Sequence, residues 1–137
     1  MSTRYRTEAI NDDGGTGVSR IAGGLEVAVS NPLSPDADLS RSNPEQLLAL
    51  AWATCLDATL QAIVTGAHRT RVRVEVELHD SPERGGYEFH ATAFVSAEGR
   101  TMPETEELVA AAHDRCPISR LLQGAATVGI RAEEWAS

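Results

Sequence analysis

The chain has 137 residues, 42% of them hydrophobic and 23% charged, which fits a single soluble domain over residues 1–137 with one modest core. Its 20 acidic and 12 basic residues give a net charge of −8, and that charge repels both nucleic acid and anionic membrane surfaces. We therefore expect no nucleic-acid partner and no membrane partner. Because no apolar stretch of the secretory type follows the first residues, we expect a cytoplasmic protein.

The N-terminal third predicts short strands connected by turns and one long loop. Residues 12–17 (DDGGTG) combine aspartates and glycines, which accept the backbone angles of tight turns. Residues 25–30 alternate apolar and polar side chains, the period of a half-buried strand, and the mixed segment 5–9 fits a short edge strand. Residues 31–42, rich in Pro, Ser and Asp, indicate a loop of a length typical of functional or mobile segments.

The clearest helix start of the chain follows this loop. Asn43 is a favoured N-cap residue, Pro44 suits the first helical position, and Glu45 faces the positive end of the helix dipole. Gln46 completes a capping box. The apolar residues that follow predict a helix to about Val64, and because they occupy nearly every face we expect the central, largely buried helix of the core rather than a membrane span.

The rest of the chain mixes strands and helices without a regular βαβ repeat, which indicates the α+β class. Strict alternation of valines with charged residues marks its clearest strand, and a turn signal then favours a hairpin with the next one. The expected elements are a strand over 72–78, a turn over 81–86, a strand over 87–95, a helix from the capping box at 101–104 through 112, a short helix from 116 to near 124 and a strand over 126–131.

Cys55 lies well inside the predicted long helix. Helical spacing puts Leu48, Ala51, Trp52 and Thr59 on its face. Burial among apolar atoms would raise the pKa of its thiol and leave it inert. A reactive Cys55 therefore needs a cation or hydrogen-bond donors from elsewhere in the fold.

Cys116 has a different setting. It precedes Pro117 at the start of a predicted helix, where free backbone N–H groups favour a thiolate, and Arg115, Arg120 and His113 are sequence neighbours. Two cysteines are too few for a disulfide scaffold. From the residues alone, the pair is either two buried core cysteines or a chemical device.

Two segments resemble the signatures of the organic hydroperoxide resistance family, within the larger group of OsmC-type proteins. Asn-Pro-Glu-Gln-Leu at 43–47, leading to Cys55, is similar to the family's helix before its peroxidatic cysteine. Cys-Pro-Ile-Ser at 116–119, followed by Gly124, is similar to the segment around its resolving cysteine. Length, element order and the glycines at 14–15 also agree.

The resemblance implies an intertwined homodimer in which curved antiparallel sheets surround a long central helix. It also implies an antioxidant enzyme of the oxidative stress response, with a peroxiredoxin-like activity. Cys55 would attack an organic hydroperoxide and become a sulfenic acid, and Cys116 would then form a disulfide with it. No bound cofactor is implied. An external dithiol, typically lipoyl groups on another protein, would reduce the disulfide.

The resemblance further suggests residues around the thiols. Leu48, Ala51 and Trp52 would form an apolar substrate pocket that favours alkyl or lipid peroxides. Glu45 matches the glutamate that pairs with an activating arginine in the family. The family's Gly-Gly-Arg is absent, because Thr16 follows the two glycines.

Arg20 is the nearest replacement for the missing arginine, and Arg41 is the second candidate. The four histidines show no ligand spacing with either cysteine, so we expect no metal site. The alternatives are another OsmC-like peroxidase with a different substrate or reductant, and a non-catalytic lipid-binding, acyl-binding or redox-sensing protein. A hydrolase using Cys116 and His113 is disfavoured because no orienting third residue is evident.

Overall fold

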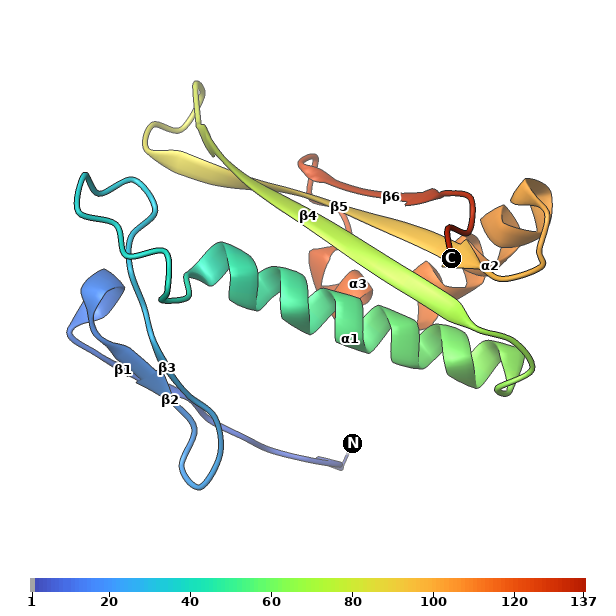
Figure 1. Ribbon diagram of the computed structural model, residues 1–137, viewed down its shortest axis with the longest axis horizontal. Helices are drawn as coiled ribbons and strands as arrows, with labels where there is room; N and C mark the ends of the chain where they lie inside the picture. The colour runs from blue at the N-terminus through green and yellow to red at the C-terminus, as the bar shows by residue number, and fades with distance from the viewer. Residues whose placement is uncertain (1) are drawn as a thin grey trace. The chain divides into compact units, whose positions relative to one another are not determined.

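A computed structural model of the protein describes residues 2–137 (Figure 1). The backbone forms two compact units, one ending at Gln46 and the other covering Leu47–Ser137. The boundary between them falls in the first turn of the long helix α1 (Pro44–Val64). Each unit has its own three-stranded sheet.

The N-terminal unit is an antiparallel meander of three short strands, β1 (Ile10–Asp12), β2 (Val18–Arg20) and β3 (Glu26–Ala28). The turn predicted over 12–17 is confirmed, since the short 3-10 helix η1 (Gly14–Thr16) connects β1 to β2. A Cβ added at Gly17 would lie 1.8 Å from the carbonyl oxygen of Asp12. This turn therefore admits only glycine there.

Two details of this unit differ from the sequence-based expectation. The edge strand predicted over 5–9 is wrong, because pairing extends outward from the turn for three residues and ends at Ile10, opposite Arg20. The strand predicted over 25–30 is confirmed at reduced length as β3. β2 was missed because three residues carry too little periodicity to be recognised.

Helix α1 begins and ends where the sequence predicts. The Oδ1 atom of Asn43 accepts the backbone N–H of Gln46 at 2.8 Å, which confirms the N-cap. At the other end, Thr65 and Gly66 adopt left-handed φ values of 53° and 72°, and the N–H of Gly66 bonds the carbonyl of Gln61 at 3.2 Å. This geometry stops the helix after Val64.

The predicted burial of α1 on nearly every face is wrong for the single chain. The buried side chains of α1 are Trp52, Leu56 and Leu60, which recur every four residues as one stripe. Leu50, on another face, is 62% exposed. Length and composition would allow α1 to cross a membrane, but its buried stripe belongs to the core cluster of the C-terminal unit.

The sheet of the C-terminal unit is built on a long hairpin. Strands β4 (Thr70–Asp80) and β5 (Tyr87–Ala97) pair along all eleven residues, and the turn between them closes with the N–H of Ser81 on the carbonyl of Gly86 at 2.9 Å. The two predicted strands and their turn are confirmed. Each strand is longer than the alternating pattern alone suggests.

The chain then crosses from β5 to a parallel neighbour. Helix α2 (Met102–Arg115) begins at the predicted capping box, and helix α3 (Pro117–Leu122) follows it directly. The last strand, β6 (Val128–Ala132), pairs parallel to β5. The expected sheet of antiparallel strands is thus mixed, because two helices leave room for a crossover connection that a short turn cannot make.

The core of this unit lies between the sheet and its helices. Ala91, Ala93 and Val95 point from β5 toward the buried stripe of α1, and Val109 and Ala112 come from α2. Figure 1 shows the three helices on the same face of this sheet.

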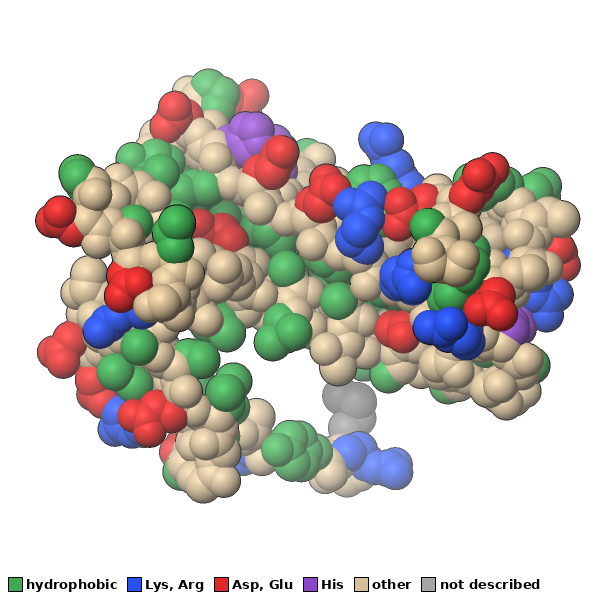
Figure 2. All heavy atoms as spheres, in the orientation of Figure 1, with side chains coloured by type: hydrophobic (Ala, Val, Ile, Leu, Met, Phe, Trp, Pro, Cys, Tyr) green, Lys and Arg blue, Asp and Glu red, His purple; other side chains and the backbone are tan. Residues whose placement is uncertain are grey.

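The opposite face of the sheet is polar. Along β4 it presents Arg71, Arg73, Glu75 and Glu77, and Arg73 pairs with both Glu75 and Glu133. Figure 2 shows acidic and basic side chains interspersed over this region. Such a mixed surface offers no broad patch of one charge.

Candidate functional site, a pair of thiols

The two cysteines of the chain meet in the C-terminal unit. The Sγ atoms of Cys55 and Cys116 lie 3.4 Å apart, although 61 positions separate the residues in sequence. Both are free thiols. Cys55 is partly exposed, whereas Cys116 has no exposed surface. A solute reaching this site therefore meets Cys55 before Cys116.

Helix α1 puts Cys55 at the edge of the core. The residue precedes Leu56, so its side chain lies beside the buried stripe rather than within it. It packs against the core cluster. The hydroxyl of Thr59 donates to the carbonyl oxygen of Cys55 at 3.0 Å, which leaves the sulfur free for other partners.

Cys116 lies at the junction of two helices. It ends α2 and precedes α3, with an extended backbone at φ −65° and ψ 122°. Its N–H still bonds the carbonyl of Ala112 at 2.8 Å, and its own carbonyl accepts the N–H of Arg120 at 2.9 Å. Pro117 suits the first helical position because that position needs no N–H donor. The short helix predicted to start here is confirmed.

The pKa of Cys116 lies below its usual value. Burial acts to raise it, but donors outweigh burial: the backbone N–H and hydroxyl of Ser119, the thiol of Cys55 and the N–H of Ile118. Each of these donors stabilises a negative sulfur. A buried sulfur is therefore the more acidic of the pair.

The pKa of Cys55 shifts in the opposite direction. Burial raises it, and although the N–H of Ile118 lowers it, the adjacent Cys116 raises it further. These directions favour the thiolate at Cys116 over the thiolate at Cys55. The two sulfurs lie within hydrogen-bond distance of each other, at 3.4 Å.

Trp52 forms a hydrogen bond with Ser119, three residues after Cys116. The indole Nε1–H of Trp52 donates to the Oγ of Ser119 at 3.0 Å in a buried contact. Both side chains have no exposed surface. This bond ties α1 to α3 next to the sulfurs.

The three residues predicted for a substrate pocket differ in exposure. Leu48 is half-buried, Ala51 is exposed and Trp52 is fully buried. Leu48 and Ala51, together with the partly exposed Cys55, thus present apolar surface on one side of α1. Trp52 fills the core and adds no exposed surface beside Cys55.

The predicted activating residues belong to the N-terminal unit. Glu45 is half-buried in the first turn of α1, and Arg20 ends β2 in an ion pair with Asp12. Arg41 donates to the carbonyl of Thr16 at 3.2 Å. Their roles toward the thiols stay predictions.

Ser119 belongs to the Cys-Pro-Ile-Ser motif at 116–119, but the sequence alone gave this residue no role. Its spacing of three residues after a helix-capping cysteine was the available signal, because side chains at that distance lie on the same side of a helical turn. His113, the other polar neighbour considered, has a buried Nδ1 atom without a hydrogen-bond partner in residues 2–137.

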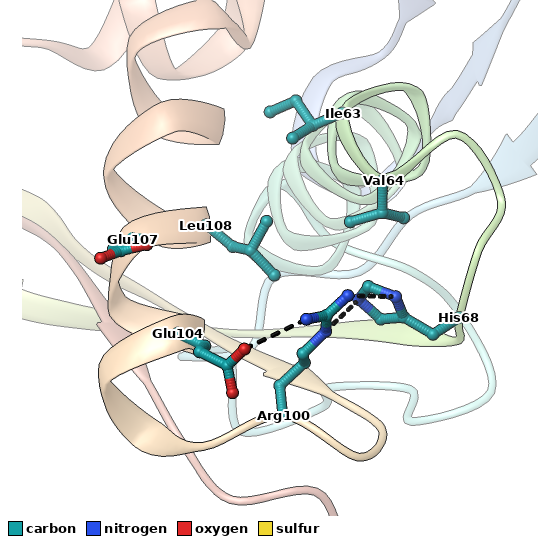
Figure 3. Close-up of a pocket in the computed structure, with 7 residues that line it drawn as sticks. All are labelled: Ile63, Val64, His68, Arg100, Glu104, Glu107 and Leu108. Atoms are coloured by element: carbon teal, nitrogen blue, oxygen red, sulfur yellow. Dashed lines mark hydrogen bonds and ion pairs between the residues drawn. The ribbon is translucent and has the colours of Figure 1, made fainter.

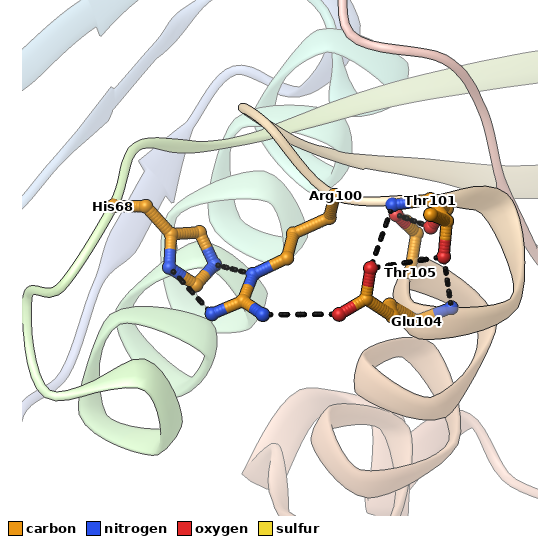
Figure 4. A network of polar contacts seen from close by, with 5 residues as sticks. All are labelled: His68, Arg100, Thr101, Glu104 and Thr105. Atoms are coloured by element: carbon orange, nitrogen blue, oxygen red, sulfur yellow. Dashed lines mark hydrogen bonds and ion pairs between the residues drawn. The ribbon is translucent and has the colours of Figure 1, made fainter.

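Away from the thiols, a hollow of the C-terminal unit is lined by the end of α1 and the start of α2. Its volume is about 310 Å³, and Figure 3 shows Arg100 at its floor between His68 and Glu104. Arg100 donates to Glu104 at 3.1 Å, and Glu104 closes the capping box with Thr101 (Figure 4). These bonds among Arg100, Thr101 and Glu104 fix the start of α2.

Metal ligands do not gather anywhere along residues 2–137, where no group of three or more His, Cys, Asp or Glu side chains could hold an ion. His79 and His90 approach closely, with ring centroids 4.1 Å apart. Their Nε2 atoms each bond a glutamate of their own strand, Glu77 and Glu88, at 2.9 Å.

Comparison with known proteins agrees with this fold and thiol arrangement. The sequence pattern of the OsmC-like protein family matches residues 35–131. The organic hydroperoxide resistance protein OhrA of Bacillus subtilis is 36% identical over 119 residues, which cover 80% of this chain and 82% of that protein.

Solved structures show the same architecture and confirm the predicted fold class. A Lactobacillus casei protein matches with a TM-score of 0.88 and 34% identity, over 99% of this chain and 95% of that one. An organic hydroperoxide resistance protein of Elizabethkingia anophelis matches with a TM-score of 0.85 and 25% identity, over 100% of both chains. The chain belongs to the OsmC-like family and, within it, to the organic hydroperoxide resistance proteins.

Proposed function

We propose that the protein is a cytoplasmic thiol peroxidase that reduces alkyl and lipid hydroperoxides to alcohols. The observation that carries this proposal is the 3.4 Å separation of the Cys55 and Cys116 sulfurs. Relatives named for organic hydroperoxide resistance support the substrate class. A pair of thiols at this separation needs little movement to form a bond, so disulfide closure is effectively intramolecular.

Cys55 takes the peroxidatic role. It is the residue of the pair that keeps exposed surface, whereas Cys116 has none. The Cys55 proton passes to the Cys116 thiolate, and the Cys55 thiolate attacks the peroxide oxygen and breaks the O–O bond. The alkoxide that leaves takes the proton from Cys116 and becomes the alcohol.

Cys116 takes the resolving role. Its thiolate attacks the sulfenic acid on Cys55 and displaces hydroxide, which takes a proton from solvent as water. One peroxide is thereby reduced by two electrons while two thiols become one disulfide. The donors around Cys116 favour this step because they favour its thiolate once the alkoxide has taken the proton.

Apolar surface beside Cys55 supports organic over hydrogen peroxide. Leu48 and Ala51 share the helix face of Cys55 and retain exposed area. An alkyl chain that covers such surface gains roughly 25 cal/mol per Å² of buried apolar area. Hydrogen peroxide has no apolar part and gains nothing from this contact.

A dithiol, in particular a lipoyl group carried by another protein, is the proposed reductant, and a homodimer is the proposed assembly. The apolar faces of α1 that the single chain leaves uncovered, with Leu50 62% exposed, support a second copy as their cover.

Glu45 and Arg20 are proposed to pair and to stabilise the Cys55 thiolate during attack. No resident cofactor takes part.

A thiol count with peroxide tests the function. We expect one equivalent of cumene hydroperoxide to convert two free thiols per chain into an intramolecular disulfide, and dihydrolipoamide to restore them. Hydrogen peroxide at the same concentration should react more slowly. Thioredoxin serves as the comparison reductant. A protein that keeps both thiols while binding the peroxide would be a binding protein instead of an enzyme.

A further inference from the structure

A buried hydrogen bond joins Trp52 of α1 to Ser119 of α3. The indole Nε1–H donates to the Oγ of Ser119 at 3.0 Å, and neither side chain has exposed surface. An indole nitrogen can only donate, and a fully buried donor has no water to replace a lost acceptor. Separating the two helices at this point would leave that donor unpaired, which is costly.

The bond lies beside the two sulfurs on both helices. Trp52 comes three residues before Cys55, and Ser119 comes three residues after Cys116. Residues three apart on a helix are neighbours on its surface. The Trp52–Ser119 bond and the 3.4 Å contact between the sulfurs therefore connect α1 to the start of α3 at two adjacent points.

Helix α3 depends on such contacts for its place in the fold. It has only six residues, and a helix this short gains little stability from its own hydrogen bonds. Before it, Cys116 has an extended backbone that ends α2, and after it, Gly124 adopts a positive φ of 91°. The helical backbone is thus interrupted on both sides, so tertiary packing holds α3 and the cysteine that precedes it.

We propose that Trp52 and Ser119 form a clasp that keeps Cys116 beside Cys55 while both are thiols, and so raises the effective concentration of one thiol at the other. This inference rests on the proposed disulfide chemistry and assigns it two positioning residues. Without the clasp, α3 must be ordered against α1 each time the sulfurs form a bond, and that ordering costs conformational entropy. With the clasp, folding has already fixed this arrangement.

The clasp and the disulfide stabilise each other. Both join the same two helices, so formation of either one brings the other pair of groups together, and linkage makes the effect equal in both directions. The equilibrium between dithiol and disulfide therefore measures the clasp. A hydrogen bond that stabilised the fold equally in both redox states would leave that equilibrium unchanged.

The redox equilibrium with glutathione is the first test. Two thiols of the chain transfer two electrons and two protons to one glutathione disulfide, which becomes two glutathione molecules while the Cys55–Cys116 bond forms. Acid quenching and alkylation with a maleimide give the fraction of disulfide. We expect an equilibrium constant about tenfold lower in Ser119→Ala, the size of one buried hydrogen bond. Trp52→Phe, which keeps a ring and the serine hydroxyl, should lower it too. Wild-type constants in both variants overturn the proposal.

The double variant ties the effect to the bond itself. If Trp52 and Ser119 act through their shared hydrogen bond, Trp52→Phe should change the constant far less in the Ser119→Ala background than in the wild type. Independent losses that multiply in the double variant would mean that each residue acts separately, and would refute the clasp. Urea unfolding of each reduced variant verifies that it is folded, and one folded single variant suffices if the other does not fold.

Two further variants control for a general loss of stability. Thr105→Val removes another buried hydroxyl, which donates to the Thr101 carbonyl at 2.9 Å, and Leu60→Val trims the same buried stripe of α1 that contains Trp52. Both should lower the free energy of unfolding and keep the glutathione constant within about twofold of the wild type. An equal decrease in these controls would assign the effect to stability and overturn the clasp.

Peroxide separates the clasp from the peroxidase proposal. If cumene hydroperoxide leaves both thiols free while the glutathione constants fall as expected, the peroxidase proposal fails and the clasp stands. If peroxide closes the disulfide but the variants keep the wild-type glutathione constant, the clasp fails and the peroxidase proposal stands.

Discussion

The two cysteines meet at one site, yet the regions that carry them differ in almost every respect. Cys55 sits within a long apolar helix, partly exposed, and its pKa is raised by burial. Cys116 sits at a junction between two helices with no exposed surface, and its pKa is nevertheless lowered. The comparison teaches that hydrogen-bond donors can lower the pKa of a thiol even where burial acts to raise it.

This comparison separates two requirements of a thiol peroxidase. The sulfur that meets the substrate must be reachable, and the sulfur that closes the disulfide must be ready as a thiolate. Helix α1 supplies the first condition at Cys55, and the turn before α3 supplies the second at Cys116. The 3.4 Å gap lets a proton pass between them.

Removing either sulfur gives the largest expected effect and tests the division of roles. Cys55→Ser should lower peroxide turnover roughly a thousandfold or more, because no accessible nucleophile remains. Cys116→Ser should also stop turnover but should still consume one peroxide per chain, leaving a sulfenic or sulfinic acid on Cys55. Mass spectrometry of the peroxide-treated variants distinguishes the two. If Cys55→Ser were the variant to consume one peroxide, the roles would be reversed.

The buried stripe of α1 should matter more to stability than any exposed leucine. Leu56→Ala should lower the free energy of unfolding by about 2–5 kcal/mol, because it leaves a cavity beneath the sheet. Leu121 is 82% exposed, and Leu121→Ala should change that free energy by about 0.5 kcal/mol or less. Urea unfolding of the reduced protein measures both. Equal losses would contradict the packing described here.

The opposite pKa directions should appear as two separated titrations. A lowered pKa produces thiolate at lower pH, so Cys116 in the Cys55→Ser variant should ionise below the range of an ordinary cysteine. A raised pKa delays ionisation, so Cys55 in the Cys116→Ser variant should ionise above that range. Absorbance at 240 nm against pH records each curve. If Cys55 ionised at lower pH than Cys116, the opposite pKa directions described for the two regions would be wrong.

Arg20 gives a small expected effect on stability, and its variant tests whether a cation from the N-terminal unit stabilises the Cys55 thiolate. Its ion pair with Asp12 is exposed, so Arg20→Ala should cost about 1 kcal/mol or less in unfolding free energy. If Arg20 stabilises the Cys55 thiolate, the same variant should slow peroxide reduction and move Cys55 alkylation to higher pH. Arg6→Ala, which breaks another exposed ion pair of the same unit, with Glu8, is the matched control. An unchanged alkylation profile in Arg20→Ala would exclude that residue from the mechanism.

Much of the fold could be predicted from the sequence, because its signals are local. The N-cap at Asn43 and the capping box at Thr101 each depend on residues within one helical turn. The alternation along β4 likewise predicts a strand. The parallel pairing of β6 with β5 could not be predicted this way, since it depends on contacts across the α2–α3 crossover.

The site could be predicted in part for a related reason. Each cysteine was recognised through a motif around it, but no local pattern states that two sulfurs 61 positions apart come within 3.4 Å. The Trp52–Ser119 bond spans 67 positions and was not anticipated. The exposure of the remaining faces of α1 could not be predicted either. The apolar composition of a helix does not say which other element, in the same chain or in a second one, covers each face.

The long sequence separation of the thiols affects how the protein is made. During synthesis at about 5–20 residues per second, the ribosome adds Cys116 about 3–12 s after Cys55, given the 61 positions between them. In that interval the nascent chain holds a lone thiol with no partner for disulfide formation. The docked crossover helices then hold the two sulfurs together, so the close pairing of the thiols is a product of completed folding.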